Sequence, residues 1–402
     1  MRHVERLRVH LGGMTVGELG TDARGRIYFR YDAAWLQQGF DLSPGTLLFQ
    51  GESQLSPQPQ EFAGLHGVFH DSLPDGWGLL LMDRVFRLQV GWAAHEITPL
   101  DRLAYIGSRA MGALEYEPEI LAEDIDAIVD MAQLARSAER LLSGETPEVL
   151  EQLRIQGGSP GGARPKVTVA LSPTADQCLS GFNPLPDDYA HWIVKFRARE
   201  DPPDMGRIEQ AYARMARLAG LGMPESRLLQ VGEGVTADEF FAVRRFDRDG
   251  QQRYPMLSLS GYLYANHRLP CVDYETVINA TLNITRSVQE AEKVFRLMLF
   301  NVLAYNRDDH AKNFAFIRRE QGWELSPAFD LTFSSGMNNQ HTTDIAGSGN
   351  PGLAEIRRVA DSCGIRRWRE LLETVSAATG QWDAIAEEEG FLLRSDGGSV
   401  ML

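Results

Sequence analysis

The sequence contains few cysteines. There are three in 402 residues, Cys178, Cys271 and Cys363, and they lie far apart. Disulfide frameworks and structural zinc sites need more cysteines at short, regular spacings. We therefore exclude both and expect free, buried thiols.

The sequence also lacks a long apolar segment. No apolar run approaches the roughly 18 residues that a membrane-spanning helix needs. The N-terminal stretch MRHVERLRVHLGG has no apolar core of the kind found in signal peptides. We expect a cytoplasmic protein with no membrane partner.

Positive charge is in deficit. The chain has 40 Lys and Arg residues against 55 Asp and Glu residues, which gives a formal net charge of −15. A large nucleic-acid footprint needs concentrated Lys and Arg. Any contact with DNA should therefore go through a basic partner, and the basic stretch 244–248 is expected to be solvated surface.

Length and composition are those of a globular protein with two or three domains. Residues 8–50 alternate short apolar strands with turns, as in a meander, whereas residues 251–402 show mainly helical patterns. The predicted class is α+β. Within 69–86, Asp71 and Ser72 are possible helix caps and an apolar stripe follows Pro74. A further helix is expected from Ile208 to Gly220 or Gly222. The other helices are expected over 119–143, 147–154, 256–264, 274–280, 288–304, 353–363, 365–379 and 381–389.

A polar loop follows the helix predicted over 288–304. It reads NRDDHAKN over 306–313, and SPAFD follows over 326–330. In protein kinases, phosphoryl transfer uses a carboxylate that accepts the proton of the substrate hydroxyl. An amide five residues later holds a metal ion, and a second carboxylate follows beyond a hairpin. Asp308, Asn313 and Asp330 have this order and spacing. An Asp-x₄-Asn spacing alone would equally suit turn residues and a cap.

Two short strands, 314–317 and 323–325, are predicted to form that hairpin around a turn at 318–322. Such a hairpin would return Asp330 beside Asn313. Mg²⁺ takes few protein ligands and prefers carboxylates together with substrate phosphates. The sequence therefore predicts a magnesium site made by these two residues.

A glycine-rich loop, QGGSPGGARPK over 156–166, precedes a strand predicted over 167–171. Glycines let backbone N–H groups approach phosphates, and Lys166 adds a positive charge. We predict a phosphate cradle that includes Gly161, Gly162 and Ala163. The loop matches no Walker or GxGxxG pattern, and a plain linker would have similar composition.

Lys195 lies among apolar residues in a strand predicted over 189–196. An ammonium group there needs an anionic partner unless it reaches solvent from the strand edge. The phosphates of ATP would serve, together with Glu209 at the start of the following helix. The strand over 239–247 then runs into a linker with the position of a kinase hinge, and we place Arg244 and Phe246 at the nucleotide there.

Several segments together resemble one family. They are PDGWG at 74–78, GALEYEP at 112–118, GGSPGGARPK at 157–166, IVKF at 193–196, RRFDR at 244–248, DDHAKNF at 308–314 and SPAFD at 326–330. In this order they resemble the HipA family, whose members are Ser/Thr protein kinases that act as toxins of type II toxin–antitoxin modules.

The resemblance implies a bilobal protein-kinase-like fold. It would have an N-terminal β-rich HipA-type domain over 1–118, a kinase N-lobe over 119–250 and a helical C-lobe over 251–402. It further implies ATP and Mg²⁺ as cofactors, and a protein substrate such as an aminoacyl-tRNA synthetase or another translation component. A HipB-like helix-turn-helix antitoxin would be the partner, and DNA would be bound only through it.

The resemblance also assigns roles to individual residues. Asp308 resembles the catalytic base, Asn313 and Asp330 the metal ligands, and Lys195 the lysine that holds the ATP phosphates. Ser159 falls where the family has an autophosphorylated serine, although a turn hydroxyl beside Pro160 is the structural alternative.

Asp309 is a departure from the family, which commonly has Gly at that position. The second carboxylate leaves the choice of base open, although the five-residue interval favours Asp308. His310 is expected to orient the loop by hydrogen bonding at the nucleotide site. Lys312 is expected to help neutralise the transferred phosphoryl group.

Two other functions remain open at this point. The same three residues would serve a phosphotransferase that acts on a small metabolite. A catalytically weak co-repressor, whose main task is to bind an antitoxin, is the alternative from a different class.

Overall fold

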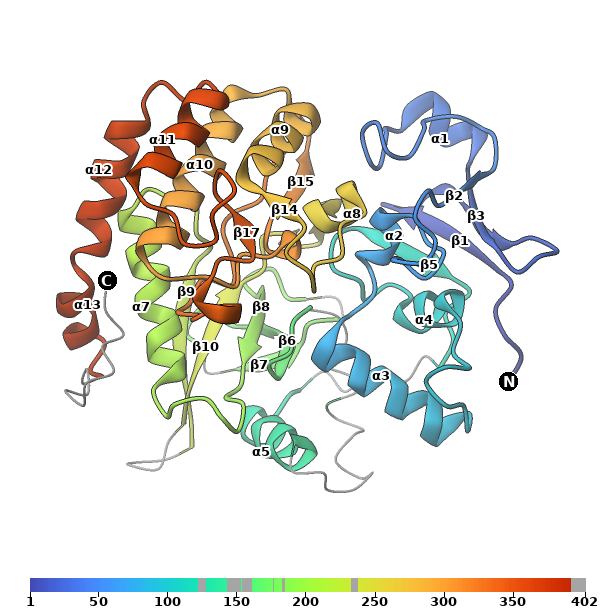
Figure 1. Cartoon of the computed structure of the whole chain (residues 1–402). Helices are drawn as coiled ribbons and strands as arrows, with labels where there is room; N and C mark the ends of the chain where they lie inside the picture. Colours follow the sequence, from blue (N-terminus) through green and yellow to red (C-terminus); the bar gives the residue numbers. More distant parts are fainter. Residues whose placement is uncertain are drawn as a thin grey trace. The chain divides into compact units, whose positions relative to one another are not determined.

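The computed structural model describes residues 1–121, 128–142, 153, 161–175, 177–182, 185–232 and 238–391, and Figure 1 shows the course of the chain. The chain forms two compact units. The first contains Met1–Pro203 and Leu229–Leu257, and the second contains Asp204–Leu228 and Ser258–Leu402. The predicted three-part division at residues 118 and 250 stays a prediction.

The first unit opens with a five-stranded antiparallel sheet. In β1, Leu7 and Val9 are buried while their neighbours are exposed, which is the period of two of a half-buried strand. Gly12 and Gly13 both have positive φ, as a two-residue hairpin loop requires. The first three strands form the predicted meander, which ends at Tyr31. The strand order is β4-β3-β2-β1-β5, with β1 (Arg6–Leu11), β2 (Met14–Thr21), β3 (Ile27–Tyr31), β4 (Gln54–Leu55) and β5 (Leu114–Glu117).

Four helices accompany this sheet. The apolar stripe predicted after Pro74 is a helix that begins at Gly76. Its N-cap is Asp75, whereas Asp71, a predicted cap, ends a separate short helix, because Pro74 disfavours helical backbone before it. Thr98 and Asp101 form a capping box that fixes the start of the last of the four. The helices are α1 (Ala33–Gln38), α2 (Gly67–His70), α3 (Gly76–Gln89) and α4 (Pro99–Ile106).

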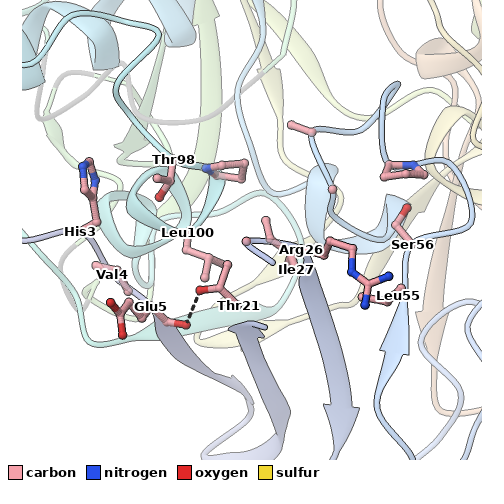
Figure 2. Close-up of a pocket in the computed structure, with 15 residues that line it drawn as sticks. His3, Val4, Glu5, Thr21, Arg26, Ile27, Leu55, Ser56, Thr98 and Leu100 are labelled. Atoms are coloured by element: carbon pink, nitrogen blue, oxygen red, sulfur yellow. Dashed lines mark hydrogen bonds between the residues drawn. The ribbon is translucent and has the colours of Figure 1, made fainter. Parts of the chain in front are cut away.

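A pocket of about 540 Å³ is lined by residues of this sheet and its connections (Figure 2). Ile27, Leu55 and Leu100 contribute apolar surface, and Arg26, which forms an ion pair with Asp22 at 2.7 Å, also lines it. None of the residues predicted to carry chemistry lies in this pocket. This pocket is therefore separate from the predicted site residues.

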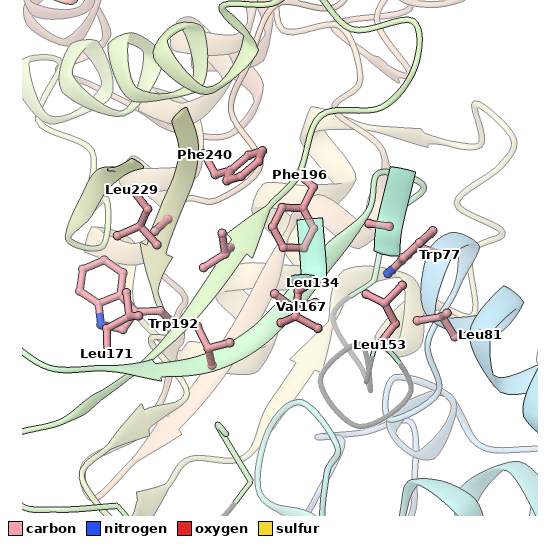
Figure 3. Close-up of a cluster of buried hydrophobic side chains, with 14 of the residues drawn as sticks. Trp77, Leu81, Leu134, Leu153, Val167, Leu171, Trp192, Phe196, Leu229 and Phe240 are labelled. Atoms are coloured by element: carbon pink, nitrogen blue, oxygen red, sulfur yellow. The ribbon is translucent and has the colours of Figure 1, made fainter. Parts of the chain in front are cut away.

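A second five-stranded sheet completes the first unit. Its apolar face packs into one core with Trp77 and Leu81 of α3 and Leu134 of α5 (Met131–Leu142), as Figure 3 shows. This packing fixes α3 against the strands that carry Lys166 and Lys195. The order is β7-β6-β8-β10-β9, with β6 (Lys166–Leu171), β7 (Cys178–Ser180), β8 (Ala190–Lys195), β9 (Ser226–Val231) and β10 (Asp238–Arg244).

The helix predicted over 119–143 is shorter than expected. It begins at Met131, because Ile128 forms a β-bridge with Leu179 and the Val129 N–H donates to the Cys178 carbonyl at 3.0 Å. The helix predicted over 147–154 lies outside the described residues except for Leu153.

The second unit is mainly helical, and its central helices are prominent in Figure 1. Helix α10 packs against α9 and α12, and the Tyr212 hydroxyl on α7 donates to the Ala304 carbonyl at 2.7 Å. Strands β15 (Ala315–Arg319) and β16 (Gly322–Leu325) form the predicted hairpin, and β14 (Val272–Asp273) pairs with β17 (Thr343–Asp344). The helices are α7 (Met205–Leu218), α8 (Leu259–Leu263), α9 (Tyr274–Thr285), α10 (Val288–Leu303), α11 (Leu353–Ser362), α12 (Trp368–Thr379) and α13 (Trp382–Glu388).

Two expectations from composition can be compared with the structure. Within the described part of the chain, no helix is both long and apolar enough to cross a membrane. All three cysteines are free, as predicted. The expectation that they are buried was wrong, because Cys271 is exposed and the other two are partly buried.

Candidate active site

The polar loop of the second unit begins where α10 ends. The Asn306 N–H donates to the Asn301 carbonyl at 2.9 Å, which closes the helix and turns the chain. Asp308 is exposed, whereas Asp309 next to it is 1% exposed. The two adjacent carboxylates therefore have different environments.

Asn313 lies close to Asp308 in space as well as in sequence. Its Nδ2 donates to the Asp308 carbonyl oxygen at 2.7 Å, so Oδ1 is the atom through which this amide can ligate a metal. His310 caps the short 3₁₀ turn Ala311–Asn313, because its Nδ1 accepts a hydrogen bond from the Lys312 N–H at 3.3 Å. The loop thus holds Asp308 and Asn313 in one compact arrangement.

Asp309 is saturated by hydrogen bonds. Oδ2 accepts from the Tyr274 hydroxyl at 2.8 Å and from His341 Nδ1 at 2.9 Å. Oδ1 accepts from the backbone N–H groups of Thr342 at 2.9 Å and Thr343 at 3.2 Å. A buried carboxylate with four donors is poorly suited to take a proton from a substrate. Asp309 is therefore a poor candidate for the base, and the assignment of that role to Asp308 stays a prediction.

The hairpin brings the chain back toward Asn313. In β15 and β16, Phe316 is opposite Leu325, and the Ser326 N–H donates to the Ala315 carbonyl at 2.8 Å. Asp330 follows four residues later with φ +56°, a left-handed conformation that Asp tolerates better than most residues. Strained backbone of this kind is concentrated at functional sites.

Asn313 and Asp330 each offer an oxygen ligand of the kind that Mg²⁺ prefers, and their joint role as its ligands stays a prediction. Among the residues that the structure describes, no group of three or more His, Cys, Asp or Glu side chains could hold a metal ion. Mg²⁺ needs no such cage, because it usually retains waters and takes substrate phosphate oxygens beside one or two protein ligands.

Two lysines face each other in the first unit. Lys166 on β6 and Lys195 on β8 are directly opposite in the antiparallel register, so their side chains emerge on the same face of the sheet. Lys166 Nζ donates to the Gly161 carbonyl at 2.6 Å, and Lys195 Nζ lies 5.7 Å from the centre of the Phe241 ring. This register places two lysines side by side on one face of the sheet. Their predicted role in holding phosphates stays a prediction.

The described end of the glycine-rich loop is tied to the start of α3. The Gly162 N–H donates to the Asp75 carboxylate, and its carbonyl accepts from the Trp77 N–H at 3.1 Å. A Cβ on Gly76 would lie 2.6 Å from the Gly162 oxygen, so only glycine fits there. Ala163 follows in the same loop, and the predicted Ser159 lies outside the described residues.

Nothing in the sequence indicated that Asp75 and Gly76 contact the glycine-rich loop. Both lie in PDGWG, a segment that carried the family resemblance but had no assigned role. Their contact with Gly162 spans 87 residues of sequence, and no spacing within either segment indicates it.

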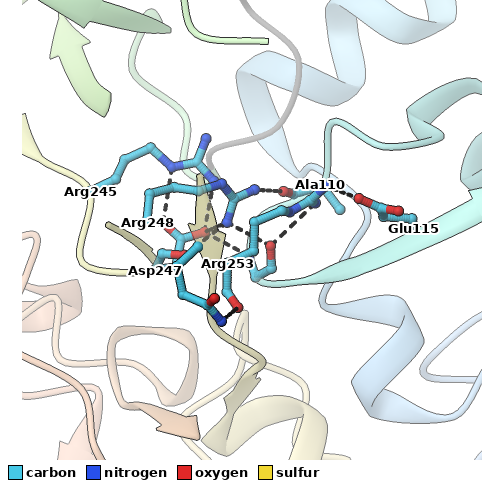
Figure 4. A network of polar contacts seen from close by, with 8 residues as sticks. Ala110, Glu115, Arg245, Asp247, Arg248 and Arg253 are labelled. Carbon is cyan, nitrogen blue, oxygen red and sulfur yellow. Dashed lines mark hydrogen bonds and ion pairs between the residues drawn. The ribbon is translucent and has the colours of Figure 1, made fainter. Parts of the chain in front are cut away.

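The basic stretch 244–248 is not solvated surface, so that expectation was wrong. Arg245 and Arg248 are buried and donate to Asp247, which also accepts from the Gly112 N–H at 2.7 Å (Figure 4). Arg244 is more exposed and forms an ion pair with Asp249 at 3.5 Å, and Phe246 is half-buried.

The predicted site residues therefore fall into two groups. Lys166, Lys195 and residues 161–163 and 244–246 belong to the first unit, and Asp308, His310, Lys312, Asn313 and Asp330 belong to the second. Glu209, predicted as the partner of Lys195, is buried on α7 of the second unit.

Sequence models of two domains match this chain. The model of the HipA N-terminal domain matches residues 7–117, and that of the HipA-like C-terminal domain matches residues 158–382. The chain belongs to the HipA family. The resemblance inferred from its motifs is thereby confirmed.

Two curated relatives of the HipA-family chain carry kinase names. A putative kinase of Haemophilus influenzae is 27% identical over 189 residues, which cover 44% of this chain and 52% of that protein. The Serine/threonine-protein kinase toxin HipA of Shewanella oneidensis is 22% identical over 358 residues, which cover 81% of this chain and 74% of that protein. The match thus spans about half the length of the first relative.

A solved structure shows the fold. HipA in the Shewanella oneidensis complex of HipA, HipB and operator DNA aligns with a TM-score of 0.72 at 20% identity, over 98% of this chain and 93% of that one. The predicted α+β fold of the HipA type is therefore confirmed.

Proposed function

We propose that this chain is an ATP-dependent Ser/Thr protein kinase and the toxin of a type II toxin–antitoxin module. The observation that carries the proposal is the contrast between exposed Asp308, held beside Asn313, and buried, saturated Asp309. Membership of the HipA family and relatives named as kinases support it.

Asp308 is the proposed general base. It would accept the proton of a Ser or Thr hydroxyl while that oxygen bonds to the γ-phosphorus and the bond to ADP breaks. Its carboxylate is exposed, and the bond from Asn313 to its carbonyl fixes the backbone that carries it. A base in this position typically contributes 10²–10⁴-fold to the rate.

Asn313 and Asp330 are the residues that would hold Mg²⁺. The bound ion would neutralise charge on the nucleotide phosphates. Asn313 presents Oδ1 because its Nδ2 is engaged by Asp308. Asp330 follows the hairpin by five residues, in a left-handed conformation, and would supply a carboxylate oxygen.

Lysines would bind the anionic part of the nucleotide. The chain has four lysines, and Lys166, Lys195 and Lys312 lie in the two groups of site residues. Lys166 and Lys195 would neutralise the α- and β-phosphates, and Lys312 the transferred group. Arg244 and Phe246 are proposed to lie at the adenine.

Lys195→Ala should raise the KM for ATP. Loss of one charge-assisted hydrogen bond to phosphate corresponds to a change of about ten- to hundredfold. The measurement is initial rate against ATP concentration at saturating Mg²⁺. The fourth lysine, Lys293, is 57% exposed and paired with Glu290, so Lys293→Ala is the matched control with unchanged KM. Equal effects in both variants would contradict the assignment.

Ser159 is the proposed autophosphorylation site. A phosphate adds about two negative charges to the loop where the ATP phosphates should bind, so the modified loop would be repelled from the nucleotide site. Mass spectrometry after incubation with Mg²⁺ and ATP should find a phosphopeptide that Ser159→Ala lacks. A phosphopeptide that persists in the variant would place the modification elsewhere.

The class of acceptor is tested with γ-labelled ATP, Mg²⁺ and cell extract. Labelled protein bands, absent with Asp308→Asn, support the kinase. Labelled small molecules without labelled protein would instead identify a metabolite phosphotransferase. No transfer at all would leave a co-repressor role.

The partner we propose is a HipB-like helix-turn-helix antitoxin. A net charge of −15 disfavours direct DNA binding and suits a basic partner that contacts DNA itself. The aligned HipA structure contains HipB and operator DNA. The proposed substrate is a translation component, such as an aminoacyl-tRNA synthetase.

A further inference from the structure

The segment that follows Asp330 is hydrogen-bonded at both of its ends to the polar loop that contains Asp308 and Asp309. On leaving, the Ser334 N–H donates to the Tyr305 carbonyl at 3.0 Å, and the Arg307 N–H donates to the Ser334 carbonyl at 3.3 Å. The segment thus begins bonded to the residues immediately before Asp308.

Its return is bonded to the residue immediately after Asp308. The Asp309 carboxylate accepts hydrogen bonds from His341 Nδ1 and from the N–H groups of Thr342 and Thr343. The Thr343 hydroxyl donates to the Asp309 carbonyl, and β17, which contains Thr343, pairs with β14 on its other edge. One buried side chain therefore holds three consecutive residues of the segment.

Between these ends the chain is exposed. Met337 is 72% exposed, and Asn338 and Asn339 both have left-handed backbones. Residues 337–340 are all exposed, and the contacts nearest to them are those of Ser335 and Gly336 with Arg307, whose Nη1 donates to the Ser335 carbonyl at 3.4 Å. Their position depends on the bonds at the two ends of the segment.

The environment of Asp309 keeps its carboxylate fixed. Burial, followed by the nearby Asp309 charge, raises the pKa of Tyr274 well above its ordinary value, so the phenol keeps its proton and donates to Asp309. Asn301 Nδ2 donates to the same hydroxyl at 2.9 Å, and Asn306 Nδ2 donates to Asn301 Oδ1 at 3.0 Å. This chain of bonds connects Asp309 back to α9, to α10 and to the start of the loop.

We propose that Asp309 is a positioning residue, whose buried carboxylate holds residues 333–343 against the Asp308 loop without covalent modification. The inference rests on the proposed kinase function. Many kinases order the equivalent segment by phosphorylation, which adds a charge that new hydrogen bonds then hold. In this chain a genetically encoded carboxylate supplies that charge, so the segment is ordered as soon as the chain folds.

The test compares Asp309→Asn with the wild-type full-length chain. The amide leaves one acceptor oxygen and turns an N–H₂ group toward the remaining donors. Three quantities are measured: the Kd of Mg²⁺–ATP, the kcat for label transfer into the chain itself and into dephosphorylated casein, and amide hydrogen exchange. We expect a nearly unchanged Kd, a loss of about 100-fold in kcat from misplacement of the loop, and much faster exchange at Thr342 and Thr343.

Two further variants separate positioning from general loss of stability. His341→Asn can place Nδ2 where Nδ1 donates and should retain most of the rate, whereas His341→Leu should not. Thr281→Val removes a buried hydroxyl that donates to the Val277 carbonyl at 2.8 Å inside α9, so it destabilises the same unit away from the loop. It should leave kcat of the folded protein unchanged.

Unchanged exchange at Thr342 and Thr343 in Asp309→Asn would overturn the proposal. So would faster exchange with an unchanged kcat, or a kcat no lower than that of Thr281→Val. Failure of the kinase function has a different signature, since the wild-type chain would then transfer no label to protein. The exchange measurement would still decide whether Asp309 holds the segment.

Discussion

Asp308→Asn should lower kcat for protein phosphorylation by about 10²–10⁴-fold, which is the usual contribution of a general base. The amide has nearly the same size as the carboxylate but cannot accept the hydroxyl proton at neutral pH. Asn313 bonds to the backbone carbonyl of Asp308, not to its side chain, so the loop should keep its shape. The KM for ATP should change little.

The measurement is label transfer from γ-labelled ATP, with thermal unfolding recorded in parallel. Asp361→Asn is a matched control in the same unit, because that carboxylate is exposed on α11 and pairs only with Arg357, at 3.4 Å, among the ion pairs described. It should keep the wild-type rate. A wild-type rate in Asp308→Asn would refute the base assignment, and a large fall in Tm would show that the residue has a structural role instead.

Local sequence patterns were sufficient to predict several helices and strands. The helix over 288–304 and the hairpin after Asn313 agree with the structure to within two residues, because apolar periodicity and turn residues determine both. The family motifs ordered these elements along the chain. The fold was therefore accessible from the sequence.

Contacts between segments that are distant in the sequence could not be predicted from it. That Lys166 lies opposite Lys195 depends on the register of two strands, which no residue in either strand specifies alone. The roles of Asp308 and Asp309 could not be separated until Tyr274 and His341, more than 30 residues away on either side, were seen to surround one of them.

The prediction that the basic stretch 244–248 is solvated surface was wrong for the same reason. Its sequence contains three arginines and one aspartate, and solvated surface is the usual location of such a stretch. Burial of Arg245 and Arg248 becomes possible because Asp247 pairs with both and because the backbone near Gly112 accepts further bonds. Those acceptors lie about 135 residues earlier.

Asp247→Ala should destabilise the first unit by about 3–5 kcal/mol, because removing one partner leaves buried, uncompensated charge. Asp247 Oδ1 accepts from Arg245 Nε at 2.9 Å, and Oδ2 accepts from Arg248 Nη1 at 2.7 Å. Arg248 in turn donates to the carbonyls of Gly112 and Ala110 at 2.7 and 3.0 Å. The variant therefore leaves two buried arginines without their carboxylate and removes the acceptor of the Gly112 N–H.

Urea unfolding followed by tryptophan fluorescence measures the effect. Asp249→Ala is the matched control two residues away, since its side chain is 69% exposed and its ion pair with Arg244 is long. A surface change of that kind is usually within about 0.5 kcal/mol. Adding Arg245→Met and Arg248→Met to Asp247→Ala should recover stability, because the buried charges are then removed together. A mild effect of Asp247→Ala alone would contradict the role assigned to this cluster.

The same cluster sets an expected pH dependence. Burial alone would raise the pKa of Asp247, but Arg245 and Arg248, aided by their hydrogen bonds and that of Gly112, hold it well below its usual range. Burial first, and then the charges of Arg245 and Arg248, lower the pKa of His191 to about 4. A depressed carboxyl pKa stabilises the folded state above the unfolded value of about 3.9, and this contribution is lost as pH falls through the folded pKa. As pH falls below about 4, the free energy of unfolding of the wild-type chain should therefore decline more steeply than that of Asp247→Asn, because the amide does not titrate. Parallel curves of the two proteins in that range would show that the arginines do not hold Asp247 as an anion.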